Sequence, residues 1–241
     1  MLFNQIIGQQ HIINHLKRSA DHDRIAHAQL FVGANGVGTL ASAIAYAQYI
    51  LCNHNETCDA RVAKLQHPDL HFAFPTAVND NVKKHPVSKL FLKDWRIFVK
   101  ENPYGSLFQW YQRLGIENKQ GQIGVDEAEE IVNAIKLKSY EGGYKVMIIW
   151  MAEKMNNAAA NKLLKLLEEP PAKTIFLLIV EKPELLINTI LSRCQILEFP
   201  LLSDENITEA LIDRENSFPA EAKKIAYSAE GSYQKALELL K

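Results

Sequence analysis

Short apolar runs that alternate with helical stretches constrain the fold of this chain more than any other feature. They cover residues 29–32, 70–74, 144–150, 174–180 and 195–199. Nearly continuous apolar strands separated by helices are typical of a parallel sheet, because the crossover helices cover both of its faces. The pattern predicts an α/β fold with a parallel five-stranded sheet flanked by helices.

The stretches between the apolar runs show helical periodicity. We expect helices over residues 6–22, 123–140 and 157–169, the last ended by Pro170 and Pro171. Residues 76–118 are rich in aromatic side chains and are interpreted as a helical insertion. Short helices over 204–212, 220–229 and 232–240 predict a small helical lid domain at 201–241, next to a nucleotide-fold domain at 1–200.

The charge balance limits direct nucleic-acid binding. The 241 residues include 27 Lys and Arg and 28 Asp and Glu, for a net charge of -1. A protein held mainly by phosphate contacts would be clearly basic, so any nucleic-acid role is local or indirect. Lys136, Lys138 and Lys145 are candidates for DNA contact, although a solvated helix face explains the first two equally well.

The cysteines and the hydropathy pattern indicate the cellular compartment of the chain. Cys52, Cys58 and Cys194 are odd in number and spread out, which does not match a secreted disulfide framework. No apolar stretch is long enough to span a bilayer, and the first ten residues do not resemble a signal peptide. We therefore expect reduced cysteines and a cytoplasmic location.

A glycine-rich loop follows the first apolar run. Gly33, Gly36 and Gly38 have the spacing of a phosphate-binding Walker A loop, with a strand before and a helix after. The lysine that should reach the terminal phosphates is replaced by Thr39, and the magnesium ligand by Leu40. The backbone could still cradle phosphates, but without charge compensation we expect this degenerate loop to be empty. The alternative is a turn that merely joins a strand to a helix.

A second catalytic position is degenerate as well. In ATPases of this type an apolar strand ends in acids that hold magnesium and activate water, and here Trp150 and Met151 stand in those places. Glu153 lies further along and is interpreted as a solvated helix residue. Because two independent positions have lost their charge, we predict that the chain does not hydrolyse ATP by itself.

Motifs in order along the chain resemble the clamp-loader branch of the AAA+ proteins. They are Ile7-Gly8-Gln9, residues 27–33, His67-Pro68-Asp69, Tyr144-Lys145-Val146, residues 161–171 and residues 189–195. Within that branch, a degenerate loop combined with an intact Ser192-Arg193-Cys194 motif is similar to delta-prime subunits rather than to the ATP-hydrolysing gamma/tau subunits.

This resemblance implies a role in DNA replication. It places the chain in the DNA polymerase III holoenzyme, a nucleotidyltransferase complex, with gamma/tau and delta subunits, the sliding clamp and primed DNA as partners. Arg193 would act in trans on ATP bound to a neighbouring subunit, as an arginine finger. Ser192 would shape the turn, and Cys194 would pack as a small apolar side chain.

The chain departs from its relatives at several places. Many relatives bind structural zinc through four cysteines, whereas this stretch keeps only Cys52 and Cys58; His54 or His67 could complete a site, but we expect no metal and no cofactor. Gln234 stands where active relatives often carry arginine, and Glu181 where a small polar residue is common. Full-length relatives continue into a helical collar domain, which we expect to be missing from these residues.

Two alternative functions remain as hypotheses. One is a divergent ATPase, and the other is a metal-binding regulatory module that uses Cys52 and Cys58.

Overall fold

A fully parallel sheet forms the centre of the molecule. The computed structural model describes residues 2–53 and 55–241. The strands are β1 (Ala28–Val32), β2 (Leu70–Ala73), β3 (Lys145–Trp150), β4 (Thr174–Val180) and β5 (Gln195–Glu198). They form a five-stranded sheet in the order β2-β3-β4-β1-β5, with every neighbouring pair parallel. The α/β fold is confirmed, and each strand lies within one residue of its expected bounds.

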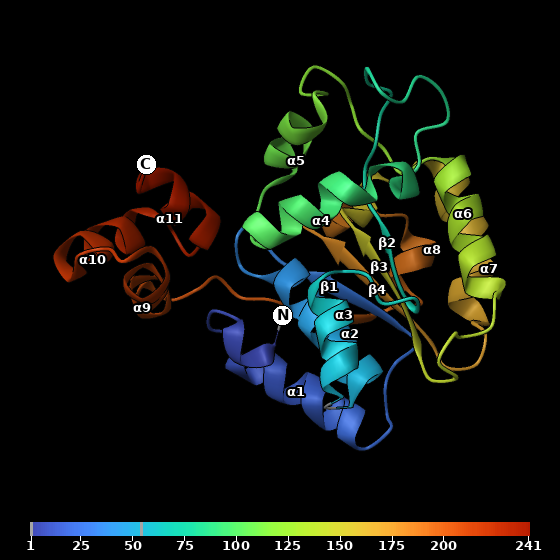
Figure 1. The fold of residues 1–241 in the computed structure, drawn as a ribbon, viewed down its shortest axis with the longest axis horizontal. Helices are drawn as coiled ribbons and strands as arrows, with labels where there is room; N and C mark the ends of the chain where they lie inside the picture. Colours follow the sequence, from blue (N-terminus) through green and yellow to red (C-terminus); the bar gives the residue numbers. More distant parts are fainter. Residues whose placement is uncertain (1, 54) are drawn as a thin grey trace.

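Alternating side chains divide the core into two layers. From β3, Val146 and Ile148 enter one apolar cluster, whereas Met147 and Ile149 enter the other. The first layer carries α1 (Gln10–Asp21), α2 (Thr39–Cys52), α3 (Glu56–Ala63), α4 (Leu92–Glu101) and α5 (Leu107–Leu114). The second layer carries α6 (Val125–Lys136), α7 (Asn157–Glu168) and α8 (Asn188–Leu191), as Figure 1 shows. Both faces of the sheet are therefore covered, which explains its continuous apolar strands.

Some expected helices have different bounds in the structure. Helix α6 ends at Lys136, and the buried Lys145 donates from Nζ to the carbonyls of Ala134 and Ile135 in its last turn, both at 3.1 Å. The suggestion that Lys145 faces DNA is therefore wrong, whereas Lys136 and Lys138 are exposed. Helix α3 was not expected at all; it begins after Asn55, whose side chain accepts from the Cys58 amide. Short 3-10 helices add Phe3–Gln5, Ser88–Phe91, Ala152–Lys154 and Pro183–Leu185.

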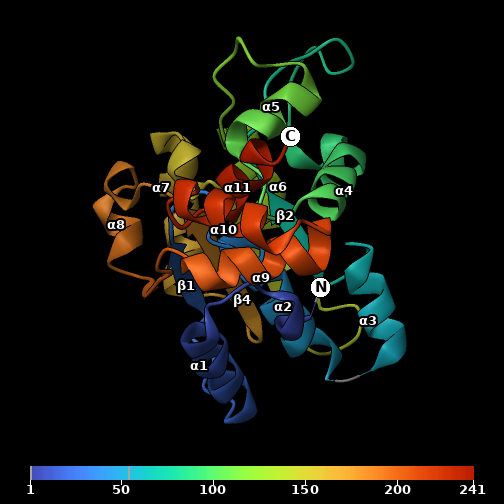
Figure 2. The same ribbon diagram turned by 90° about the vertical axis from the view of Figure 1, so that its left-hand side faces the viewer.

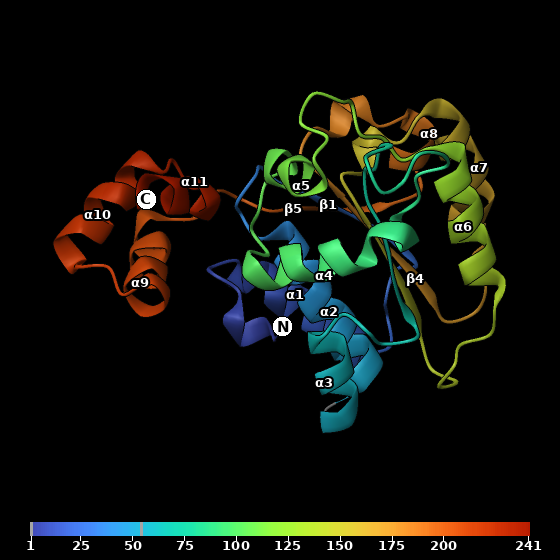
Figure 3. The ribbon, with the colours of Figure 1, turned by 45° about the horizontal axis from the view of Figure 1, so that its top comes forward.

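The aromatic-rich insertion packs onto the end of the sheet. Its second half forms α4 and α5, and Figure 3 shows both helices beside the strands. The rings of Trp95 and Phe74 stack at 4.3 Å, and Trp95 also lies 5.2 Å from Trp150. The Trp110 indole donates to the carbonyl of Pro75 at 2.8 Å. The insertion is therefore part of the core and not a flexible appendage.

The C-terminal helices gather beside the sheet as a lid. They are α9 (Asp204–Glu215), α10 (Pro219–Ser228) and α11 (Tyr233–Leu239), drawn in orange and red in Figures 1 and 2. The lid contacts the rest of the chain at the glycine-rich loop, where the Tyr233 amide donates to the Gly36 carbonyl at 3.1 Å. Within the part of the chain that the structure describes, no helix is both long and apolar enough to cross a membrane.

Candidate functional site

The glycine-rich loop, residues 33–40, has the expected frame. It connects β1 to α2, with Gly36 at φ 82° and Gly38 at φ 95°. These left-handed angles favour glycine, because any other residue would be strained there. The Gly33 amide donates to the Val180 carbonyl at 3.1 Å, which ties the loop to the end of β4. The loop therefore lies between a strand and a helix, which is the frame that a phosphate-binding loop requires.

The two residues after the last glycine are buried instead of facing a ligand. Thr39 is 9% exposed and begins α2, and Leu40 is 3% exposed and belongs to the apolar core. Neither supplies a cation, and Leu40, at the magnesium position, has no oxygen ligand for a metal. Residues that would have to hold phosphate charge thus stabilise the core.

The strand end that carries acids in active ATPases is also apolar. Trp150 and Met151 are each 2% exposed. The Trp150 ring lies 5.7 Å from the ring of Phe98, inside the aromatic cluster of the insertion. Magnesium coordination requires oxygen ligands, which these side chains lack.

The carboxylates nearest the loop are half-buried. The interpretation of Glu153 as a solvated residue is wrong: its Oε1 accepts from the Glu181 amide at 3.0 Å. The 3-10 turn after β3 carries Glu153 to the end of β4, which helical periodicity could not indicate. Burial raises the pKa of both carboxyl groups above the usual value for glutamate. Asn35 in the loop donates from Nδ2 to Glu181 Oε1 at 3.4 Å, so one acid does reach the loop.

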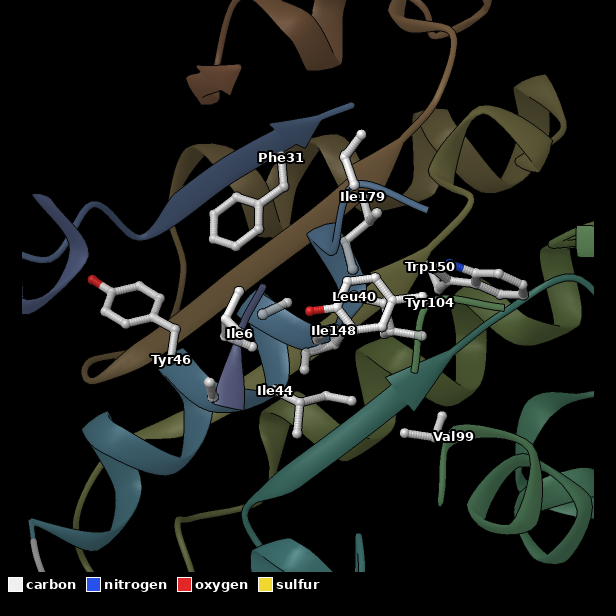
Figure 4. Close-up of a cluster of buried hydrophobic side chains, with 14 of the residues drawn as sticks. Ile6, Phe31, Leu40, Ile44, Tyr46, Val99, Tyr104, Ile148, Trp150 and Ile179 are labelled. Atoms are coloured by element: carbon white, nitrogen blue, oxygen red, sulfur yellow. The ribbon is translucent and has the colours of Figure 1, made fainter. Parts of the chain in front are cut away.

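Little space remains where a nucleotide would bind. The cavity lined by the loop, Trp150, Glu181 and Tyr104 measures about 20 Å³. Ligand pockets usually measure hundreds of Å³, and a single water needs about 10–15 Å³. Figure 4 shows Tyr104 and Trp150 beside Leu40 in this region. Gln234 of the lid is 2% exposed and donates to Glu238 at 2.8 Å, so it is part of the lid packing.

The Ser192-Arg193-Cys194 turn is polar and accessible. Arg193 retains 31% of its side-chain exposure and donates from Nε to Glu168 at 2.7 Å, with Nη2 bonded to the same carboxylate. Its Nη1 donates to the Thr189 carbonyl at 2.7 Å and to Ser192 Oγ at 3.3 Å. Cys194 packs against the second apolar layer, and burial raises its pKa to about 11. The guanidinium is thus charged, oriented and close to solvent.

Arg193 lies at the opposite end of the sheet from the glycine-rich loop. Gln195 is level with Gln29 in the parallel register of β1 and β5. Gly33 lies four residues beyond Gln29, roughly 13 Å at 3.3 Å per strand residue, and Arg193 precedes Gln195. Arg193 therefore cannot serve the loop of its own chain.

Comparison with known proteins decides the family. The model of the family described as DNA polymerase III, delta subunit, matches residues 8–203, which is most of the chain. The chain belongs to this family. Its resemblance to delta'-like clamp-loader subunits is thereby confirmed.

Individual relatives agree with this family. The chain is 29% identical to DNA polymerase III subunit delta' of Bacillus subtilis over 216 residues, covering 87% of the chain and 53% of the relative. It is 26% identical to subunit tau of Escherichia coli over 242 residues, covering 98% of the chain and 32% of the relative. The chain thus spans about half or less of the length of these curated relatives.

Solved structures confirm the AAA+ fold. RuvB of Thermotoga maritima, described as a Holliday junction branch migration motor, superposes with a TM-score of 0.59 at 14% identity. The match covers 99% of the chain and 62% of the RuvB chain. Because the identity is low, the likeness concerns the fold alone.

Because of how Cys52 and Cys58 are bonded in this structure, the two cysteines do not fit a structural zinc site. Cys52 and Cys58 form a disulfide, so the expectation of reduced cysteines is wrong for this pair. The chain reverses after α2 and brings their Cα atoms within 5.2 Å. Cys58, His67 and Glu141 have ligand atoms within 4.8 Å of one another, but a disulfide sulfur is not the thiolate that zinc binds. His54 lies outside the described residues.

Proposed function

We propose that the chain is a non-hydrolysing subunit of a bacterial clamp loader, which presents Arg193 in trans to ATP on a neighbouring subunit. The observation that carries this proposal is the placement of Arg193. It is charged and accessible at the sheet end opposite its own loop, and that loop opens into a cavity of only about 20 Å³. An arginine that cannot reach its own pocket can serve the pocket of an adjacent subunit.

The chemistry of such an arginine is electrostatic. A guanidinium beside the transferring phosphoryl group stabilises the charge that spreads over its oxygens in the transition state. Arg193 already donates from Nε and Nη2 to one oxygen of the Glu168 carboxylate, Oε1, and a phosphate oxygen would accept the same two hydrogen bonds. Arg193 would need only to move its side chain to leave the Glu168 carboxylate and bind a phosphate instead.

The partners follow from the family. We propose that gamma/tau-type and delta-type subunits surround this chain, and that it helps to load the sliding clamp onto primed DNA in the cytoplasm. The net charge of -1 agrees with a subunit that contacts DNA through the complex and not through a basic face of its own.

A reconstituted complex tests the proposal. ATP hydrolysis stimulated by clamp and primed DNA is measured with the wild-type chain and with Arg193→Ala, and assembly is followed by gel filtration. Arginine fingers contribute about 10³–10⁵-fold to the rate, so a loss approaching that size is expected if a single hydrolysing site depends on Arg193. Arg113→Ala is the matched control, because Arg113 also pairs with a glutamate and is 26% exposed. Unchanged hydrolysis in an intact complex containing Arg193→Ala would refute the finger.

A divergent ATPase is the second candidate function. The observation that favours it is the contact of Glu181 with Asn35, because a noncanonical magnesium site would need an acid at the loop. The small cavity and the buried Trp150 and Met151 oppose it. Turnover by the isolated chain separates the two candidates, and labelled ATP tests whether nucleotide binds without cleavage. We expect neither turnover nor binding.

A further inference from the structure

The side chain of Tyr104 enters the region above the glycine-rich loop. Tyr104 lies in the connection between α4 and α5 and is 3% exposed. Its ring is so close to the loop that a Cβ atom built on Gly38 would lie 2.8 Å from Tyr104 Cε1. Gly38 therefore gives the ring room to lie directly on the loop backbone.

The hydroxyl of Tyr104 contacts a second part of the chain. It accepts a hydrogen bond from the Ile7 amide at 2.9 Å, across 97 residues of sequence. Burial raises the pKa of this phenol, so it remains a neutral hydroxyl over the ordinary pH range. Ile7 belongs to the segment before α1, and its amide therefore gains a specific partner inside the core.

The lid supplies a third set of contacts. The rings of Tyr104 and Tyr233 meet edge to face with centroids 5.2 Å apart. In the same connection, Asn102 accepts from the Tyr104 amide at 3.0 Å and donates to Gln234. The lid also approaches the loop directly, because a Cβ atom on Gly36 would lie 2.2 Å from Ser232 Oγ. One ring thus contacts the loop, the segment before α1 and the lid together.

We propose that Tyr104 is a built-in occupant of the pocket between the loop and the lid, and that removing its ring opens a binding site for one phenol-sized aromatic molecule. The ring and its neighbours leave a cavity of only about 20 Å³. Apolar cavities of about 150 Å³ bind benzene in other proteins, and loss of a tyrosine ring leaves a space of that order. The inference is independent of Arg193, because it concerns only the closed pocket.

The site has a defined chemistry. Leu40, Trp150 and Ile179 provide apolar walls. The Ile7 amide donates to the Tyr104 hydroxyl, and the Arg214 side chain is a second hydrogen-bond partner of that hydroxyl. A ligand of this site is therefore a small planar ring that carries one acceptor, which is the chemistry of phenol. In the native chain the same interactions are intramolecular, so the lid stays attached to the core without any added ligand.

The experiment uses Tyr104→Ala in the full chain, with phenol as the probe. Phenol corresponds to the part of the tyrosine side chain that alanine lacks. We expect a lower melting temperature for Tyr104→Ala and partial recovery with millimolar phenol. At a phenol concentration ten times its Kd, the folding equilibrium shifts about 11-fold toward the folded state. The wild-type chain, whose pocket is filled, should show no such recovery.

Hydrogen exchange at the Ile7 amide locates the bound probe. In Tyr104→Ala this amide should exchange faster than in the wild-type chain, and phenol should slow it again. Benzene, which lacks the acceptor, should raise the melting temperature without protecting Ile7. Tyr104→Phe keeps the ring and removes the hydroxyl, so it should expose Ile7 to exchange but bind no phenol.

Phe176→Ala is the control for a cavity elsewhere. Phe176 is also fully buried, on β4 in the second apolar layer, and its removal should leave exchange at Ile7 unchanged whether or not phenol binds. If Tyr104→Ala does not fold, Tyr104→Val is used, because valine fills part of the space. The proposal is overturned if phenol stabilises the wild-type chain and the folded variant equally, if it stabilises neither, or if Ile7 exchange does not respond.

Discussion

The glycine-rich loop and the Ser192-Arg193-Cys194 turn, the two motifs on which the proposed function rests, have opposite physical character. Around the loop, the residues in the catalytic positions are apolar and buried, including Leu40 and Trp150. At the turn, Arg193 is charged and accessible. A pocket gains stability when side chains fill it, because an empty cavity costs free energy in proportion to its volume. Under the proposed function Arg193 has to reach a neighbouring subunit, and a charge with that role has to stay near solvent.

The loop nevertheless keeps its glycines, and packing explains this without any bound phosphate. The Gly36 carbonyl accepts from the lid, and Gly38 lies against the Tyr104 ring. A side chain at either position would collide with those neighbours. The shape of the loop is therefore required by the closed pocket itself.

The largest effect is expected from returning an acid to the closed pocket. Trp150→Asp would remove a ring from the aromatic cluster and place a carboxylate in the core. Loss of a buried tryptophan side chain costs about 3–5 kcal/mol, and an unpaired buried charge adds to that. We expect the unfolding free energy, measured with denaturant, to fall by at least about 4 kcal/mol, with no gain of ATP hydrolysis.

Trp150→Phe is the control for that prediction. It keeps an apolar ring in the cluster and should cost about 1–2 kcal/mol. If Trp150→Asp were as stable as the wild-type chain, the strand end would be open to solvent or to a metal ion. The contrast between a closed, apolar loop region and an accessible, charged turn would then be refuted.

The frame of the molecule was predictable from the sequence because it depends on local patterns. Apolar runs fix strands, and two successive prolines end α7 within one residue of the expected place. The glycine spacing located the loop, and Thr39 and Leu40 indicated that its charges were missing. These signals act over a few residues, so no distant partner had to be known.

Contacts between distant segments were not predictable in the same way. Tyr104 meets Ile7 across 97 residues, and nothing in the aromatic-rich insertion distinguishes Tyr104 from the other rings around it. The turn that brings Glu153 to the end of β4 likewise depends on three-dimensional packing. Cys52 and Cys58 are only six residues apart, but their pairing depends on a chain reversal that the sequence pattern did not indicate. The bonds from Lys145 to the last carbonyls of α6 also require that β3, on which this lysine lies, packs beside the helix.

A smaller effect should appear in the pH dependence of stability at the closed pocket. Burial raises the pKa of Glu153 and Glu181 above 4.5 in the folded chain. Between 4.5 and the raised values the folded state binds more protons than the unfolded state, so the stabilisation is full below pH 4.5 and is lost as the pH rises. Glu181→Gln should make this decline shallower in denaturant unfolding measured from pH 4.5 upward.

Glu184→Gln is the matched control for the pH series. Glu184 lies three residues further along and is exposed, so this substitution should leave the slope of the wild-type chain unchanged. An equal slope for Glu181→Gln and the wild-type chain would mean that Glu181 is solvated in the folded protein. The carboxylate at the loop would then not belong to the closed pocket.

The smallest effect is expected at the turn, where Glu168→Gln weakens the partner of Arg193. Both side chains are partly exposed, and such pairs contribute about 0–1 kcal/mol because water and salt screen them. We expect a stability loss below about 1 kcal/mol and retention of stimulated hydrolysis in the reconstituted complex. A weak pair allows the guanidinium to exchange a carboxylate for a phosphate at little cost, whereas a rigid pair would oppose that exchange. A hundredfold loss of hydrolysis with Glu168→Gln would instead show that Glu168 holds Arg193 in its working position, and that the turn is as tightly packed as the loop.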